Sequence, residues 1–66
     1  MKMTAILNAD LDGGYVALNP ETGTTTQGDT VEEAIANLRE AVELYLEEFP
    51  LKTADAPIVT SFDVAA

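Results

Sequence analysis

The residues of this chain that could carry chemistry are almost all carboxylates. Twelve Asp and Glu stand against three Lys and Arg, for a formal net charge of −9, and the 66 residues include no His, Cys or Trp. Nucleophilic catalysis by a Ser–His or Cys–His pair is therefore excluded within the chain. Paired carboxylates can act as general acid and base, but only in a pocket that shifts their pKa values. The acids here fall in a turn and along a predicted helix, so we expect neither a catalytic site nor an enzyme.

One stretch has the ligand spacing of a calcium loop. Residues 8–13, with the sequence NADLDG, match the opening of an EF-hand, including its glycine. The twelfth position of such a loop falls on Asn19, where a bidentate Glu is needed, and Pro20 follows where a helix should begin. An Asp- and Gly-rich hairpin turn explains the stretch better. We therefore expect no metal and no other cofactor.

Three strands and one helix are predicted to position the acids. Alternating and strand-forming residues predict a β-hairpin that joins residues 2–8 to residues 15–19. The polar, β-branched run 24–27 predicts a third strand with one face open to water. A helix is predicted from about residue 31 to about residue 48, because Pro50 cannot continue it.

The helix has a clear start and a clear apolar face. Thr30 stands three residues before Glu33, which is the spacing of a capping box, although Asp29 could serve as the cap instead. The apolar residues fall within a single arc of about 140°, as in a helix that lies on a sheet. They are Val31, Ala34, Ile35, Leu38, Ala41, Val42, Tyr45, Leu46 and Phe49.

The end of the chain predicts one more strand. Residues 51–56 form a polar connector, and residues 57–64 alternate as a strand does. One face of that strand would carry Ile58, Thr60, Phe62 and Val64. The predicted fold class is α+β, in the order β-β-β-α-β, with an antiparallel sheet and one helix packed on one face. The whole chain, residues 1–66, is expected to be one domain.

Charge and hydropathy limit the classes of partner that the chain can bind. A surface of this sign repels phosphate backbones, so direct nucleic-acid binding is not expected, whereas a basic protein would be attracted. The alternative is that the acidity only keeps a small protein soluble. No apolar run approaches the roughly 18 residues of a membrane span, and residues 1–5 lack the apolar stretch and cleavage site expected of a signal peptide. We therefore expect a cytoplasmic protein with no membrane partner.

The candidate partner-binding residues lie on the predicted helix, away from its apolar arc. Four glutamates share that side and Leu44 departs from the apolar pattern beside them, so we expect them to meet a partner unless they are only solvated. The set is Glu32, Glu40, Glu43, Leu44 and Glu47.

The small size of the chain predicts self-association. A domain of this length buries only about 60% of the surface of its unfolded chain, and no disulfide can add support. An open sheet edge also has unpaired backbone N–H and C=O groups, which a strand of another chain can pair with. We therefore expect a homodimer or a tetramer.

Several segments together resemble the HicB family of antitoxins in its short, single-domain form. The resemblance lies in residues 12–17 (DGGYVA), 19–21 (NPE), 26–34 (TQGDTVEEA), 37–38 (NL), 40–41 (EA) and 45–46 (YL). It implies a β-β-β-α-β fold, sometimes described as a partial ribonuclease-H-like unit. It also implies the neutralising half of a type II toxin–antitoxin pair, which binds a small basic HicA-type toxin that cleaves messenger RNA.

The resemblance covers roughly residues 1–49. Many HicB-like proteins carry a C-terminal DNA-binding domain, but only seventeen residues follow Phe49 here and they read as one strand, so no such domain is expected. The alternative function is a solitary small oligomeric binding or scaffold domain of the same fold, with no toxin partner.

Overall fold

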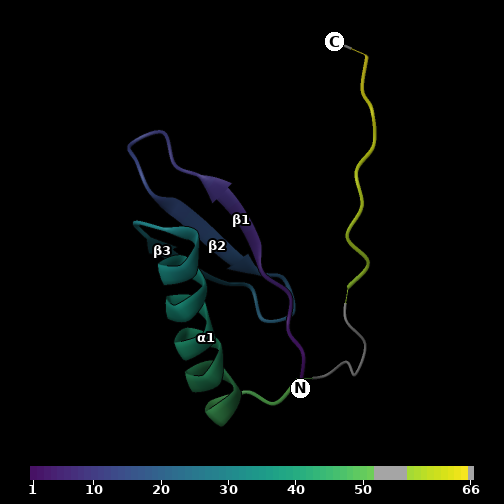
Figure 1. Ribbon diagram of the computed structural model, residues 1–66. Helices are drawn as coiled ribbons and strands as arrows, with labels where there is room; N and C mark the ends of the chain where they lie inside the picture. Colours follow the sequence, from purple (N-terminus) through teal and green to yellow (C-terminus); the bar gives the residue numbers. More distant parts are fainter. Residues whose placement is uncertain (52–56, 66) are drawn as a thin grey trace.

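The protein is a three-stranded antiparallel sheet with one helix laid across one face (Figure 1). The computed structural model describes residues 1–51 and 57–65. The elements are β1 (Ile6–Ala9), β2 (Tyr15–Asn19), β3 (Thr24–Gly28) and α1 (Val31–Glu48), and the strands lie in the order β1-β2-β3. The predicted α+β class, the hairpin and the helix bounds are confirmed. The first strand is shorter than predicted, because it begins at Ile6 rather than at residue 2.

The turn between β1 and β2 is held by its own aspartate and glycines. The Asp10 carboxylate accepts a hydrogen bond from the Asp12 backbone N–H at 3.0 Å. The Asp10 carbonyl accepts from Gly13 N–H, and the Asp10 N–H donates to the Gly14 carbonyl. Both glycines have positive φ, which other residues adopt at a cost. This stretch therefore has the hairpin role that its composition predicts.

The start of α1 follows the capping signal. The Thr30 hydroxyl accepts a hydrogen bond from the Glu33 backbone N–H at 3.1 Å, so Thr30 rather than Asp29 is the N-cap. The Glu33 carboxylate in turn accepts from the Asp29 backbone N–H at 3.2 Å. Two backbone donors at the positive end of the helix are thus satisfied by side chains.

The core lies between α1 and the two strands beneath it. Ala17 of β2 and three residues of α1, Ala34, Leu38 and Val42, are buried together. The helix contacts β3 most and β2 less. The Thr26 hydroxyl of β3 also donates to the Ala34 carbonyl at 3.1 Å. The small residues Ala17 and Ala34 allow the helix to approach the sheet closely.

The predicted final strand is not formed. Residues 57–65 carry no strand pairing in the described part of the chain, and their side chains are exposed. Figure 1 shows this segment, in yellow-green and yellow, running apart from the sheet and helix. The alternation of residues 57–64 is real, but a strand also needs a neighbouring backbone to pair with. The connector predicted over 51–56 lies, from residue 52 on, outside the described residues.

Within the described residues, no helix combines the length and the apolar character that a membrane crossing requires. α1 has 18 residues, and its sequence alternates apolar positions with glutamates.

A close backbone approach of helix and sheet predicts a sensitive position. A Cβ added to Gly28 would meet the Ala34 nitrogen and lie 2.8 Å from the Ala34 Cα, so Gly28→Ala must push α1 off β3. We expect this change to lower the free energy of unfolding by about 2–3 kcal/mol, as overpacking does. Chemical denaturation followed by circular dichroism measures it.

Gly23→Ala is the matched control. Gly23 has a φ of +79° with nothing within 4 Å of its added Cβ, so only the backbone conformation is penalised there. We expect a cost of about 1 kcal/mol. Equal costs at the two positions would contradict the close approach.

Candidate partner-binding surface

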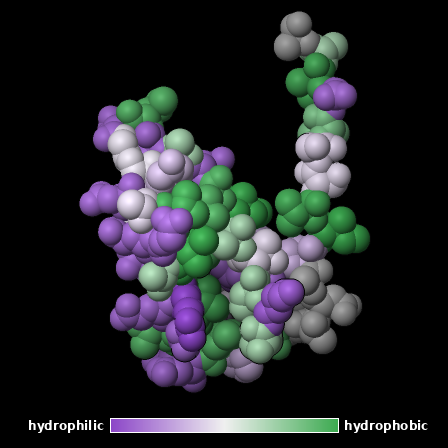
Figure 2. Space-filling model, viewed as in Figure 1, coloured by the Kyte–Doolittle hydropathy of each residue, from purple (hydrophilic) through white to green (hydrophobic). Residues whose placement is uncertain are grey.

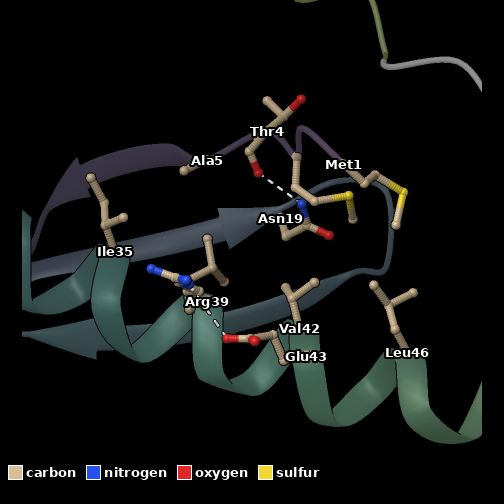
Figure 3. A pocket seen from close by; sticks show the side chains of 11 residues that line it. Met1, Thr4, Ala5, Asn19, Ile35, Arg39, Val42, Glu43 and Leu46 are labelled. Carbon is tan, nitrogen blue, oxygen red and sulfur yellow. Dashed lines mark hydrogen bonds and ion pairs between the residues drawn. The ribbon is translucent and has the colours of Figure 1, made fainter.

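A groove opens between α1 and the segment that leads into β1. Its volume is about 500 Å³, and most of its lining is apolar. Figure 3 shows the helix side chains along one wall and the N-terminal residues along the other. The lining comprises Met1, Met3, Thr4, Ala5, Asn19, Ile35, Leu38, Arg39, Val42, Glu43 and Leu46.

The groove exists because α1 lies off-centre on the sheet. The helix packs chiefly on β3 and β2 and leaves the side of β1 uncovered. Leu7 of β1 pairs with Ala17 of β2, so the two side chains point to the helix side of the sheet. Leu7 is half-buried and packs against the core. The groove itself lies ahead of β1, between residues 1–5 and α1.

Asn19 holds the groove together at the end of β2. It is the one polar residue fully buried within the described chain. Its amide nitrogen donates to the Thr4 carbonyl at 2.8 Å and to the Glu21 carboxylate at 2.7 Å. Its amide oxygen accepts from the backbone N–H and the hydroxyl of Thr22, at 2.9 and 2.7 Å. Every hydrogen-bonding position of the amide is therefore used.

The Glu21 carboxylate closes the same network on the N-terminal segment. Burial by itself raises the pKa of Glu21, but the hydrogen bonds that the carboxylate accepts outweigh burial, and the pKa falls below its ordinary value. The donors include the Thr4 hydroxyl at 3.0 Å, the Thr4 backbone N–H at 3.1 and 3.2 Å, and the Asn19 amide. Thr4 is thereby tied to the turn between β2 and β3, although it lies before β1.

The five residues predicted to meet a partner are all exposed on α1. At about 100° per residue, the four glutamates occupy one arc of about 80°. We call this set the acidic arc: Glu32, Glu40, Glu43 and Glu47. Leu44, which is 58% exposed, lies about 40° beyond Glu40, on the flank away from the groove. The structure therefore groups the acids and sets Leu44 at their border.

The acidic arc adjoins the groove. Glu43 lines the groove itself. Its carboxylate Oε1 lies 3.5 Å from the guanidinium Nε of Arg39, which lines the same wall. Both side chains are largely exposed, so this pair adds little to stability. A partner can therefore meet carboxylates and an apolar recess on one continuous surface.

Sequence reasoning missed the groove and the role of Asn19. Ile35 and Leu46 were expected on the apolar arc, but the sequence does not show that the arc is wider than the sheet area that the helix covers. A local signal existed for Asn19, since Asn before Pro favours a turn. Its burial and its reach to Thr4 depend on tertiary structure.

The calcium-loop spacing does not bring ligands together. Asp10 faces the Asp12 backbone N–H rather than a shared centre. Across residues 1–51 and 57–65, no three acidic or other metal-binding side chains are grouped as a metal site.

Comparisons with known proteins match most of the chain. A family model described as a family of unknown function, DUF7387, matches residues 4–64. The UPF0150 protein ssr1765 of Synechocystis sp. is 56% identical over 45 residues, which are 67% of this chain and 57% of the relative. The chain thus spans little more than half of the length of that relative.

Two further relatives are matched over a larger share of their length. The UPF0150 protein ssl0738 of Synechocystis sp. is 48% identical over 48 residues, which are 71% of this chain and 67% of the relative. The UPF0150 protein Ta0767 of Thermoplasma acidophilum is 46% identical over 48 residues, which are 71% of this chain and 70% of the relative. No solved structure matches the chain.

The buried amide predicts a large loss of stability on truncation. Asn19→Ala leaves the Thr4 carbonyl and the Thr22 donors without a partner. We expect the free energy of unfolding to fall by about 2–3 kcal/mol. Asn8→Ala, at an exposed position of β1, is the control and should change it by less than about 0.5 kcal/mol. Similar losses for both variants in denaturant titration would contradict the network.

The lowered pKa of Glu21 predicts acid sensitivity. Because the folded-state pKa lies below the unfolded one, the stabilisation by Glu21 is present above the unfolded value. It is lost as pH falls below the ordinary value of 4.5 and through the folded-state pKa. Glu21→Gln should therefore be less stable than the native chain at pH 7, and the gap should narrow towards pH 3. Unfolding curves over this pH range measure the gap, and a constant gap would contradict the assignment.

Proposed function

The chain belongs to the family of unknown function DUF7387, and we propose that this member is an antitoxin of the HicB type. In this proposal it acts in the cytoplasm, where it binds and neutralises a small basic HicA-type toxin that cleaves messenger RNA. It has no catalytic role of its own. The observation that carries the proposal is the acidic arc of α1, with the exposed Leu44 at its border, on a chain of net charge −9.

The physical argument is electrostatic complementarity. A protein that binds RNA presents cations to the phosphate backbone. Carboxylates at successive turns of α1 offer such a surface an alternative set of anions. Leu44, which is exposed at the border of the arc, adds apolar area next to those charges, and a protein interface needs such area for lasting contact. Attraction by the arc and apolar contact at Leu44 would together cover the toxin's RNA-binding surface.

The resemblance to HicB supports the same conclusion from the sequence. Segments 12–17 and 26–34, which carry it, form the β1–β2 turn with β2 and the link from β3 into α1. Both are structural in this fold, so the resemblance supports the scaffold most strongly. The toxin contact therefore has to be tested on the acidic arc itself.

The first experiment is a pull-down with the tagged chain from its native host at several salt concentrations. We expect one small basic protein, released at high salt, whose cleavage of RNA stops when this chain is added at equal concentration. A basic partner with unchanged ribonuclease activity would contradict the antitoxin role.

Charge reversal on the arc then locates the contact. Glu40→Lys with Glu47→Lys should weaken toxin binding about 10-fold at low salt, because exposed charges contribute modestly and are screened. The control is Asp12→Lys with Glu48→Lys, which lies off the arc at exposed positions. Each pair changes the net charge from −9 to −5, since each reversal adds two. Equal affinities for the two double variants would remove the arc from the interface.

The alternative function is a solitary oligomeric binding or scaffold domain. The specific observation that favours it is the amount of exposed apolar surface, in the groove and in residues 57–65. Recovery of only further copies of the chain in the pull-down would support this alternative over the antitoxin.

A further inference from the structure

The C-terminal segment carries apolar side chains that no described residue covers. We call residues 57–65 the tail. Ile58 is 94% exposed, Phe62 86% and Val64 72%. Figure 2 shows these hydrophobic residues in green on a tail that stands clear of the body. The family match runs through residue 64, so the tail belongs to the shared sequence pattern of the family rather than to an appended end.

The tail has the pattern of a strand without a partner. Ile58, Phe62 and Val64 alternate onto one face, and Val59 is on the other. Pro57 stands at the first position, where a strand tolerates proline because no ladder hydrogen bond is lost. Such a segment can satisfy its backbone by adding to the edge of a sheet.

The folded body, which comprises the sheet and α1, has one open sheet edge with which the tail can pair. At the β3 edge, the Asn37 side chain of α1 donates to the Gln27 carbonyl at 2.8 Å and so occupies part of that edge. At the β1 edge, the described residues offer no element beyond Ile6–Ala9, and alternate backbone groups of β1 point outward. The groove lies on the helix side of this same edge, where Ala5 and Met3 line it. A strand added along β1 and continued beside residues 3–5 would direct every second side chain to the helix side of the sheet, where the groove opens.

The accessible surface of the chain is larger than that of a compact protein of the same mass, and the excess indicates how much area a partner can bury. The accessible surface is 5363 Å², against roughly 4,000 Å² for a compact protein of 7.0 kDa. The excess of about 1,300 Å² exceeds the roughly 800 Å² that each partner buries in a standard interface. The radius of gyration, 13.3 Å, is likewise larger than the roughly 11 Å of a compact chain of this length.

We propose that the tail of one copy pairs as a strand with the β1 edge of a second copy, reciprocally, and fills the groove there with Ile58, Phe62 and Val64. Each copy offers one tail and one edge, so a two-fold exchange satisfies both and closes the assembly. The occupant of the groove is therefore a second copy of this chain. The exchange does not depend on a toxin partner. In the self-associated form, the tail and the β1 edge are the interface between the two copies.

Charge makes this association distinguishable from toxin binding. Two chains of net charge −9 repel one another, so added salt should tighten the exchanged dimer. The proposed toxin complex joins opposite charges and should weaken in the same salt. Failure of one proposal therefore leaves the other intact.

The first test is the mass of the purified full chain over a concentration series. Sedimentation equilibrium should give a dimer of about twice 7.0 kDa, tighter at 500 mM than at 50 mM salt. Ile58→Ser with Phe62→Ser should weaken dimerisation at least about 100-fold with an unchanged circular dichroism spectrum, because both side chains lie outside the folded body. A monomer at every concentration, or a dimer that salt weakens, overturns the proposal.

Two further variants separate strand pairing from non-specific apolar contact. Ser61→Pro keeps every apolar side chain of the tail but removes a backbone donor, so it should also weaken the dimer. Leu44→Ser removes an exposed leucine on α1 and should leave the dimer unchanged. The reverse result would place the interface on the helix and overturn the exchange.

Cross-linking decides which edge receives the tail. The chain has no cysteine, so one copy carrying Ser61→Cys is mixed with another carrying Asn8→Cys on β1, and a short bis-maleimide is added. We expect a mixed cross-linked dimer, and little product when Thr25→Cys on β3 replaces the β1 variant. Cross-linking within a single chain that carries both cysteines, with no mixed product, would show that the tail folds on its own edge and overturn the exchange.

Discussion

The buried amide of Asn19 is the interaction on which the arrangement of this small fold depends. Its two N–H groups and its oxygen join the end of β2, the following turn and the backbone of Thr4. A buried amide is costly unless all of its hydrogen bonds are made, so the network tolerates only one relative placement of these segments. The N-terminal segment is thereby held beside the helix without belonging to the sheet. One wall of the groove thus exists because of a hydrogen-bond network rather than because of strand pairing.

The helix sets the other wall through its contact with β3. The bare backbone of Gly28 lets the start of α1 approach the sheet, and the Thr30 cap begins the helix at that point. A close approach at β3 keeps the helix away from β1, because a single helix covers only about two strands of a sheet. Among the residues that the structure describes, the core consequently consists of four buried hydrophobic residues, and two are alanine. A core this small leaves apolar surface for another molecule to cover.

The exposed surface of the protein has two parts that would bind other molecules through different forces. The acidic arc of α1 gains energy by meeting cations and loses that energy in salt. The tail and the groove gain energy by excluding water and depend little on charge. They meet at Glu43, which belongs to the arc and lines the groove beside Arg39. An antitoxin that is also a self-associated strand-exchange dimer would use both parts, the arc for the toxin and the tail and groove for the second copy.

The sequence by itself determined the local elements. The hairpin, the helix from Val31 to Glu48 and the Thr30 cap follow from turn chemistry, apolar periodicity and capping, which act over a few neighbouring residues. The exposure of the acidic arc follows from the same periodicity. Tertiary structure alone decided that residues 57–64 are not a strand of this sheet, because alternation provides a face but pairing needs a neighbouring backbone. It also decided the groove and the burial of Asn19, since both depend on where the helix and the N-terminal segment come to lie over residues distant in sequence.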